Sequence, residues 1–86
     1  MSAEGVTTGD RVRVQIWACG GNGRVVGTIE AVVTYAGAFE ITARVEDGDE
    51  YLEVLTRSGC DDVADIAESM TWIGNADDVT LIERAA

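Results

Sequence analysis

The feature that most constrains the fold is a pair of alternating segments near the N-terminus. In residues 11–17, Val12, Val14 and Ile16 share one face, and polar or aromatic side chains lie between them. The same period of two continues over residues 24–35. Because successive side chains of a strand point to opposite faces, this period predicts two β-strands with one buried face. A chain that begins in this way is expected to be mainly β.

A loop rich in glycine joins the two segments. Residues 19–23 contain three glycines and an asparagine, the residues that most readily adopt positive φ. Within the second segment, Gly27 predicts a bend or a β-bulge. Before the first strand, residues 1–9 are expected to form a loose lead-in.

A hairpin is expected in the middle of the chain. Apolar residues at every second position, beginning with Phe39, predict a third strand over residues 39–45 with these side chains facing inward. The Asp47-Gly48 pair that follows is typical of a tight hairpin turn and predicts a fourth strand over residues 51–56. Either face of this fourth segment carries an apolar pair, so its inward face stays open.

The period changes to helical spacing later in the chain. Apolar residues recur every three or four positions between Cys60 and Trp72, and acidic residues occupy the opposite side. Ser58 followed by Asp61 fits a helix-capping pattern, which predicts that the helix starts there. A fifth strand is expected over residues 79–84. The prediction for residues 1–86 is therefore one small, partly open, five-stranded antiparallel barrel, with a short helix between strands four and five.

Two stretches resemble families of small β-barrels. GDRVRVQIW followed by GRVVGTIEAV is similar to the opening strands of SH3-like barrels and of Sm-like RNA-binding proteins. WIGNADDVTLIE resembles the second Sm motif, in which an Arg-Gly-Asn/Asp turn precedes the last strands. Gly74 and Asn75 match that turn, and Ile73 stands in the place of the family's RNA-contacting arginine. The resemblance implies an SH3-like barrel that lacks the Sm arginine.

The charge of the chain is strongly acidic and unevenly placed. The chain contains sixteen carboxylates and six arginines but no lysine or histidine, which gives a net charge of −10 at pH 7. Carboxylates and arginines balance in residues 1–44, so residues 45–86 carry the whole net charge. A large charge keeps a protein soluble when salt shortens the Debye length to about 3 Å at 1 M. The composition resembles that of proteins from salt-loving archaea, which implies a halophilic archaeon or its virus as the source.

Several classes of protein are not expected from these residues. Without histidine or lysine, the chain lacks the usual partners for Ser or Cys nucleophiles and for Schiff bases, so we do not expect an enzyme. The chain lacks the lysine of a phosphate-binding loop and a C-x-x-C pair, so we expect neither a cofactor nor a metal. No signal peptide or apolar run of about 20 residues is present, which predicts a cytoplasmic protein with no membrane partner. In that compartment Cys19 and Cys60 are expected to stay reduced.

A basic and aromatic surface is the strongest candidate site. It comprises Arg11, Arg13, Trp17, Arg24 and Arg44. The first three share the outward face of the first strand, and guanidinium groups beside an exposed indole suit phosphate binding with base stacking. The alternative is structural: Trp17 covers one end of the barrel, and the arginines pair with Glu30 and Glu40.

The function expected from the sequence is that of a non-enzymatic, salt-adapted binding or adaptor domain, acting on a protein partner through this surface. The first alternative is a nucleic-acid-binding barrel that uses the same residues, and the second is a structural assembly subunit joined through strand edges. Protein is favoured because a net charge of −10 opposes approach to a polyanion. No residue identifies the partner or the oligomeric state.

Overall fold

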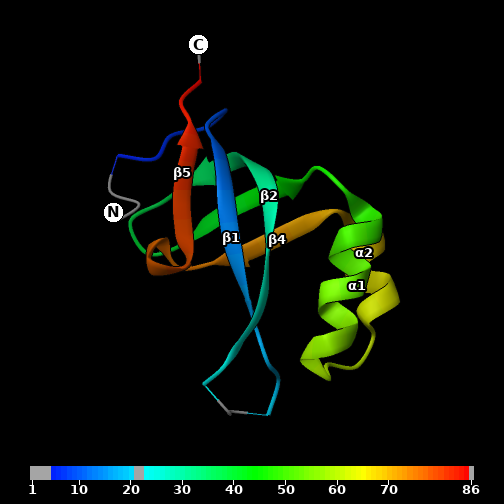
Figure 1. Ribbon diagram of the computed structural model, residues 1–86. Coiled ribbons are helices and arrows are strands. Elements are labelled where there is room, and N and C mark those ends of the chain that lie inside the picture. Colours follow the sequence, from blue (N-terminus) through cyan, green and yellow to red (C-terminus); the bar gives the residue numbers. More distant parts are fainter. Residues whose placement is uncertain (1–4, 21–22, 86) are drawn as a thin grey trace.

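Figure 1 shows a computed structural model of the chain, which describes residues 5–20 and 23–85. Its elements are, in order, β1 (Arg11–Trp17), β2 (Val25–Ala36), β3 (Ile41–Val45), α1 (Gly48–Ser58), α2 (Val63–Ser69), β4 (Thr71–Gly74), the 3₁₀ helix η1 (Ala76–Asp78) and β5 (Val79–Glu83). The structure confirms a mainly β fold with five antiparallel strands. Parts of the predicted lead-in and glycine loop, residues 1–4 and 21–22, lie outside the described residues.

The strands form one open sheet in the order β4-β3-β2-β1-β5. In the part of the chain that the structure describes, β4 and β5 are the two edges and do not pair with each other, so a closed barrel is not observed. The two helices pack together beside one end of the sheet, whereas β5 lies on the opposite side of β1 from β2 (Figure 1).

The buried face of the sheet follows the predicted alternation. All of the following side chains are buried: Val12, Val14 and Ile16 in β1, Ile29, Ala31 and Val33 in β2, and Ile41, Ala43 and Val45 in β3. The prediction for β5 is also confirmed, because Val79 is buried and Ile82 is exposed. These residues form the apolar layer that holds the sheet together.

Two aromatic residues near the turn between β2 and β3 are exposed. Phe39 precedes β3 and is 91% exposed, so the prediction that it faces the core is wrong. Tyr35 is also exposed because the register of β2 on β3 shifts between Val33 and Tyr35. This β-bulge pairs Tyr35 with Thr42, on the outward face of the sheet.

The predicted fourth strand, residues 51–56, is part of helix α1 instead. The predicted hairpin turn is the start of this helix: Oδ1 of Asp47 accepts hydrogen bonds from the backbone N–H groups of Asp49 (3.0 Å) and Glu50 (3.2 Å). A side chain that caps a helix in this way satisfies amides that would otherwise lack partners. The buried residues of α1 recur at helical spacing, at Tyr51, Val54, Leu55 and Ser58.

The predicted helix over residues 60–72 is shorter than expected and differently placed. Helix α2 covers only Val63–Ser69, and Trp72 belongs to strand β4. Ser58 ends α1 rather than starting the next helix, since Gly59 adopts the left-handed conformation (φ 76°) that commonly ends a helix. Two helices therefore lie between β3 and β4, in place of one helix between the last two strands.

Gly27 allows α1 to pack closely on β2. A Cβ atom at this position would lie 2.9 Å from Cγ1 of Val54, which is shorter than a van der Waals contact.

We expect Gly27→Ala to lower the free energy of unfolding by about 1–3 kcal/mol, because the helix must move away from the sheet. Urea unfolding measures this loss. Adding Val54→Ala should recover part of it by making room, and two independent, additive losses would contradict this packing.

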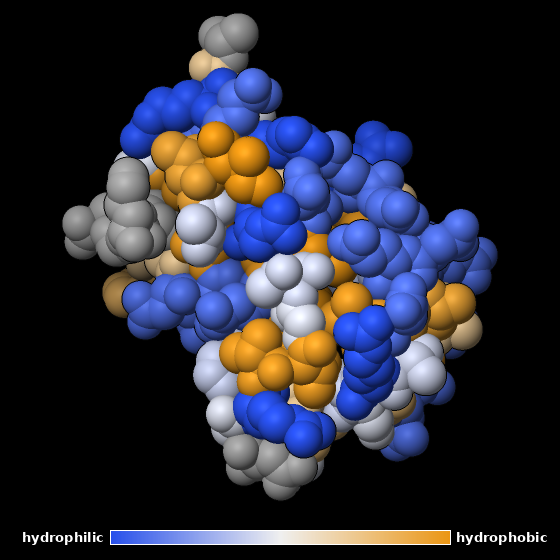
Figure 2. Space-filling view, viewed as in Figure 1, coloured by the Kyte–Doolittle hydropathy of each residue, from blue (hydrophilic) through white to orange (hydrophobic). Residues whose placement is uncertain are grey.

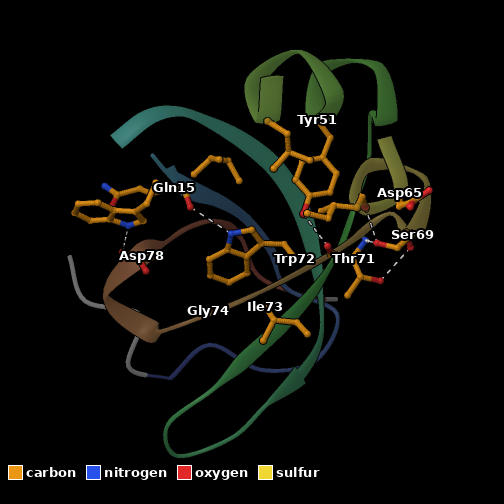
Figure 3. A pocket seen from close by; sticks show the side chains of 13 residues that line it. Gln15, Tyr51, Asp65, Ser69, Thr71, Trp72, Ile73, Gly74 and Asp78 are labelled. Atoms are coloured by element: carbon orange, nitrogen blue, oxygen red, sulfur yellow. Dashed lines mark hydrogen bonds between the residues drawn. The ribbon is translucent and has the colours of Figure 1, made fainter. Parts of the chain in front are cut away.

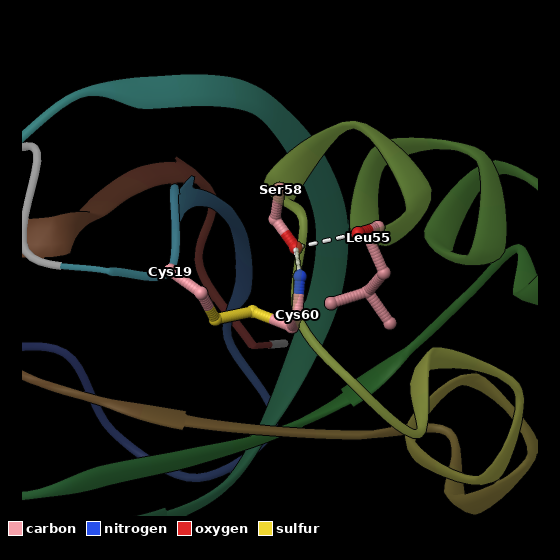
Figure 4. Close-up of a disulfide and its surroundings, with 4 residues drawn as sticks. All are labelled: Cys19, Leu55, Ser58 and Cys60. Atoms are coloured by element: carbon pink, nitrogen blue, oxygen red, sulfur yellow. Dashed lines mark hydrogen bonds between the residues drawn. A yellow bond between two sulfur atoms is a disulfide. The ribbon is translucent and has the colours of Figure 1, made fainter.

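A disulfide joins Cys19 to Cys60 (Figure 4), so the prediction of two reduced cysteines is wrong for this structure. The Cα atoms of the two residues lie 5.2 Å apart, although 41 positions separate them in the sequence. The fold brings them together because the backbone N–H of Cys19 donates to the carbonyl of Ser58 at 2.9 Å. The link thereby fastens the end of the β1 segment to the end of α1.

Asp10 connects the segments that precede β1 and follow β5. Its buried carboxylate accepts hydrogen bonds from the backbone N–H groups of Ala85 (2.7 Å) and Thr7 (2.9 Å). Arg84 lies 3.7 Å from the same carboxylate. The hydrogen bonds from Ala85 and Thr7, followed by the charge of Arg84, lower the pKa of Asp10 below its ordinary value of 3.8.

This lowered pKa predicts a loss of stability in acid. The contribution of Asp10 is complete above its ordinary pKa and disappears as the pH falls below it, because protons then bind the unfolded state more tightly. We expect Asp10→Asn to be less stable at neutral pH and to lose less further stability as the pH falls below about 4. Thermal melts across this range, with exposed Asp77→Asn as the control, measure the difference. Parallel pH profiles for Asp10→Asn and the parent protein would contradict the assignment.

Candidate binding groove

A groove of about 700 Å³ opens between the two helices, β4 and the end of β1 (Figure 3). Its lining is Gln15, Ile16 and Trp17 from β1, Tyr51 and Leu55 from α1, Asp65, Ile66 and Ser69 from α2, all four residues of β4, and Asp78 from η1. Most of this lining is apolar. The groove borders β4, which is an edge strand of the sheet.

Two aromatic side chains with paired polar groups form the floor of the groove. Trp72 is only 6% exposed, and its indole N–H donates to the carbonyl of Gln15 at 3.2 Å. The hydroxyl of Tyr51 donates to the carbonyl of Thr71 at 2.7 Å. Burial raises the pKa of Tyr51, which keeps this hydroxyl protonated as a donor. The floor is therefore fixed to β1 on one side and to β4 on the other.

The rim combines exposed apolar side chains with two carboxylates. Trp17 is 43% exposed and Ile73 is 61% exposed, and Ile66 is also exposed. The indole N–H of Trp17 donates to Oδ1 of Asp78 at 2.9 Å. Asp78 and Asp65 lie at opposite ends of the groove in Figure 3, and Trp72 lies between them. An apolar channel with an acid at each end results.

The arginines predicted to form the site are partly neutralised. Arg11 pairs with both Glu30 and Glu46 at 2.7 Å, and Arg13 lies 3.5 Å from Glu30. The hydrogen bond and charge of Glu46, together with the charge of Glu30, raise the pKa of Arg11 further above its ordinary value. The structural alternative given for this surface included pairing of the arginines with Glu30. These two guanidinium groups are thus already engaged with carboxylates.

Strand register places the other two predicted site residues beside members of the set. Arg44 lies in register with Val32, which is in turn opposite Arg11, so Arg11 and Arg44 flank one residue on the outward face. Arg24 is exposed and lies beside Val25, the register partner of Trp17. Among the described residues, neither Arg24 nor Arg44 forms an ion pair. Of the five predicted residues, only Trp17 lines the groove.

Sequence reasoning missed most of the groove. Tyr51, Asp65, Ile66, Trp72 and Ile73 were assigned to other roles, because residues 51–56 were expected to be a strand and residue 72 to end a helix. One pattern could have found part of it. Tyr51, Val54, Leu55 and Ser58 have helical spacing behind an Asp-Gly-Asp-Glu capping sequence.

Neither a metal site nor a membrane-spanning helix is found in the described part of the chain. In residues 5–20 and 23–85, no three His, Cys, Asp or Glu side chains are grouped to hold a metal ion. Neither α1, α2 nor any other helix described there has the length and apolar character needed to cross a membrane.

Comparison with known proteins adds no relative. The sequence matches no protein-family model and no curated protein, and the structure matches no solved structure. The surface itself is therefore the guide to function. Figure 2 shows one face covered mainly by hydrophilic side chains, with separate hydrophobic patches among them.

Proposed function

We propose that this protein is a non-enzymatic, salt-adapted binding domain that engages another protein through the groove. The observation that carries this proposal is the exposure of Trp17 and Ile73 on the rim of an apolar channel. Tryptophan is enriched among the residues that dominate binding energy at protein interfaces. Trp72 and Tyr51 at the floor of the groove are each held by a hydrogen bond to a backbone carbonyl, so they supply a rigid base for a partner side chain.

A protein partner fits the charges better than a nucleic acid does. Arg11 and Arg13 are paired with Glu30 and Glu46, so binding phosphate there would require breaking these pairs. The groove is lined by two carboxylates, Asp65 and Asp78, which repel a polyanion. The nucleic-acid alternative therefore depends on the exposed Arg24 and Arg44.

The arrangement of the strands supports two more specific proposals. The order of the five strands, with β1 between β2 and β5, supports our proposal of a relationship to SH3-like barrels. The free edges of β4 and β5 support the alternative of an assembly subunit joined edge to edge. Light scattering in molar KCl tests that alternative, since a 9.1 kDa monomer at high concentration would exclude it.

Amide chemical shifts from NMR test the proposed function directly. We expect a random peptide pool to shift resonances of groove residues, and Trp17→Ala to abolish these shifts without unfolding the protein. Poly(U) and single-stranded DNA, added at several KCl concentrations, should leave the spectrum unchanged. Shifts centred on Arg24 and Arg44 with either nucleic acid, and none with the peptide pool, would reverse the proposal.

Salt is expected to stabilise the fold. At a net charge of −10 the carboxylates of the folded chain repel one another, and added KCl screens the repulsion between charges that are farther apart than the Debye length. We expect the Tm to rise from low salt to molar KCl. Thermal melts followed by circular dichroism measure the trend, and a Tm that is flat or falls with KCl would refute salt adaptation.

A further inference from the structure

The outer edge of β4 offers unpaired backbone groups to the groove. The backbone N–H of Val45 donates to the carbonyl of Met70 at 2.8 Å, in the same register that pairs Ala43 with Trp72. In an antiparallel ladder, peptide groups alternate between the partner strand and the opposite side. Those of Thr71 and Ile73 therefore point away from β3.

The position of Tyr51 identifies where this edge faces. Its hydroxyl donates to the carbonyl of Thr71, which points away from β3, and Tyr51 itself lines the groove. The free edge of β4 thus opens into the groove. Within the described chain, Oγ of Ser69 lies 3.3 Å from the backbone N of Thr71, whereas the N–H and carbonyl of Ile73 form no hydrogen bond with a loop or a side chain.

A second strand segment borders the groove opposite this edge. The pairing of β1 with β5 ends at Val14, so Gln15, Ile16 and Trp17 extend beyond β5. These three residues line the groove, and the carbonyl of Gln15 accepts the hydrogen bond from Trp72. The space between the end of β1 and the edge of β4 is therefore bounded by extended backbone on both sides.

We infer that the groove receives an extended peptide segment of a partner protein, added to the edge of β4, with an apolar side chain flanked by basic residues. Addition of a strand supplies backbone hydrogen bonds to Ile73, and side-chain contacts supply selectivity. Asp65 and Asp78 at the two ends favour basic residues in the partner, since no arginine among the described residues lines the groove. This inference rests on the proposed function and adds the binding mode and the chemistry of the partner.

Synthetic peptides with blocked backbone amides test the binding mode. The probe is acetyl-SRVTVTVRS-amide, titrated into the 15N-labelled disulfide-bonded protein. We expect shifts at Thr71 to Gly74 and at Trp17. Two versions carry N-methyl groups on alternate residues, so that each blocks a different edge of the peptide. One version should lose binding and the other should retain it, because only one edge of an added strand faces β4.

Charge and side-chain variants test the partner chemistry. Replacing both arginines of the probe by glutamate should weaken binding about tenfold or more, as like charges then meet at the rim. Asp78→Asn should weaken binding of the unmodified probe. Asp77→Asn should leave this binding unchanged, because Asp77 lies outside the groove. Ile73→Ala should also weaken binding of the probe. The matched control is Ile82→Ala, since Ile82 is likewise exposed but lies on β5.

The outcomes separate the inference from the proposed function. Equal binding of both N-methylated versions would overturn strand addition, and shifts confined to β5 would overturn addition to the edge of β4. Failure of the probe to bind at all, while the random peptide pool still shifts groove resonances, would overturn the inference and leave the proposed function standing. Failure of both would reject both.

Discussion

Reducing the Cys19–Cys60 disulfide is expected to lower the free energy of unfolding by about 4 kcal/mol. The link closes a loop of 41 positions, and its removal returns conformational freedom to the unfolded chain. For a domain of this size the loss corresponds to a fall of on the order of 20 °C in Tm. Urea unfolding and thermal melts, each with and without a phosphine reductant, measure the effect.

The double variant Cys19→Ser with Cys60→Ser is the control for this experiment. It should match the reduced parent protein in stability and should not respond to the reductant. Thiol titration of the unfolded parent before reduction should find no free cysteine, because the structure pairs both. Two free thiols in the freshly purified protein, or a Tm that is unchanged by complete reduction, would contradict the prediction.

Trp72→Ala is expected to destabilise the protein by about 3–5 kcal/mol, the range for removing a large buried aromatic side chain. Trp72 is 6% exposed, belongs to the core and forms the floor of the groove. Its removal leaves a cavity and also deprives the carbonyl of Gln15 of its hydrogen bond. Chemical unfolding, followed by far-UV circular dichroism, measures the loss.

Trp17 provides a matched comparison for Trp72 in the same groove. Trp17 is 43% exposed and bonds to the carboxylate of Asp78, so Trp17→Ala should cost only about 1 kcal/mol. The two variants therefore separate stability from binding, since Trp17→Ala should remove peptide binding from a folded protein. Similar losses of stability for the two variants would contradict the burial that distinguishes them.

The central strands could be predicted because one physical cause controls them. In β1, β2 and β3 the buried face needs an apolar residue at every second position, and the sequence shows this directly. The exceptions are local: the alternation of β2 is interrupted by a β-bulge before Tyr35, and Phe39 lies before β3 begins. A bulge depends on pairing with another strand, which a single segment does not display.

The helices were harder to predict because short apolar runs fit two periods. Leu52 and Val54, or Tyr51 and Leu55, suit a strand as well as a helix, and Asp-Gly suits a hairpin turn as well as a helix cap. The capping hydrogen bonds that Asp47 accepts and the packing of Val54 over Gly27 favour the helix. Packing across the sheet thus decided a choice that local sequence left open.

The groove could be predicted only in part, because tertiary contacts assemble it. Trp17 was identified from its outward position on β1, but ten of the other lining residues come from four further elements. Arg11 and Arg13 lie on the outward face of β1, as the alternation predicts, whereas the ion pair of Arg11 with Glu46 depended on the register of β2 with β3. The disulfide likewise depended on a meeting of β1 and α1 that spacing alone did not indicate.

The position of β1 between β2 and β5 has a consequence for synthesis of the protein on the ribosome. One edge of β1 pairs with β2, which follows it closely, but the other pairs with β5, which comes near the end of the described chain. During translation this second edge therefore stays unpaired until Val79–Glu83 emerge from the exit tunnel. An open edge can pair with other nascent chains, and the charged side chains of Arg11 and Arg13 on β1 oppose such pairing while the chain is incomplete.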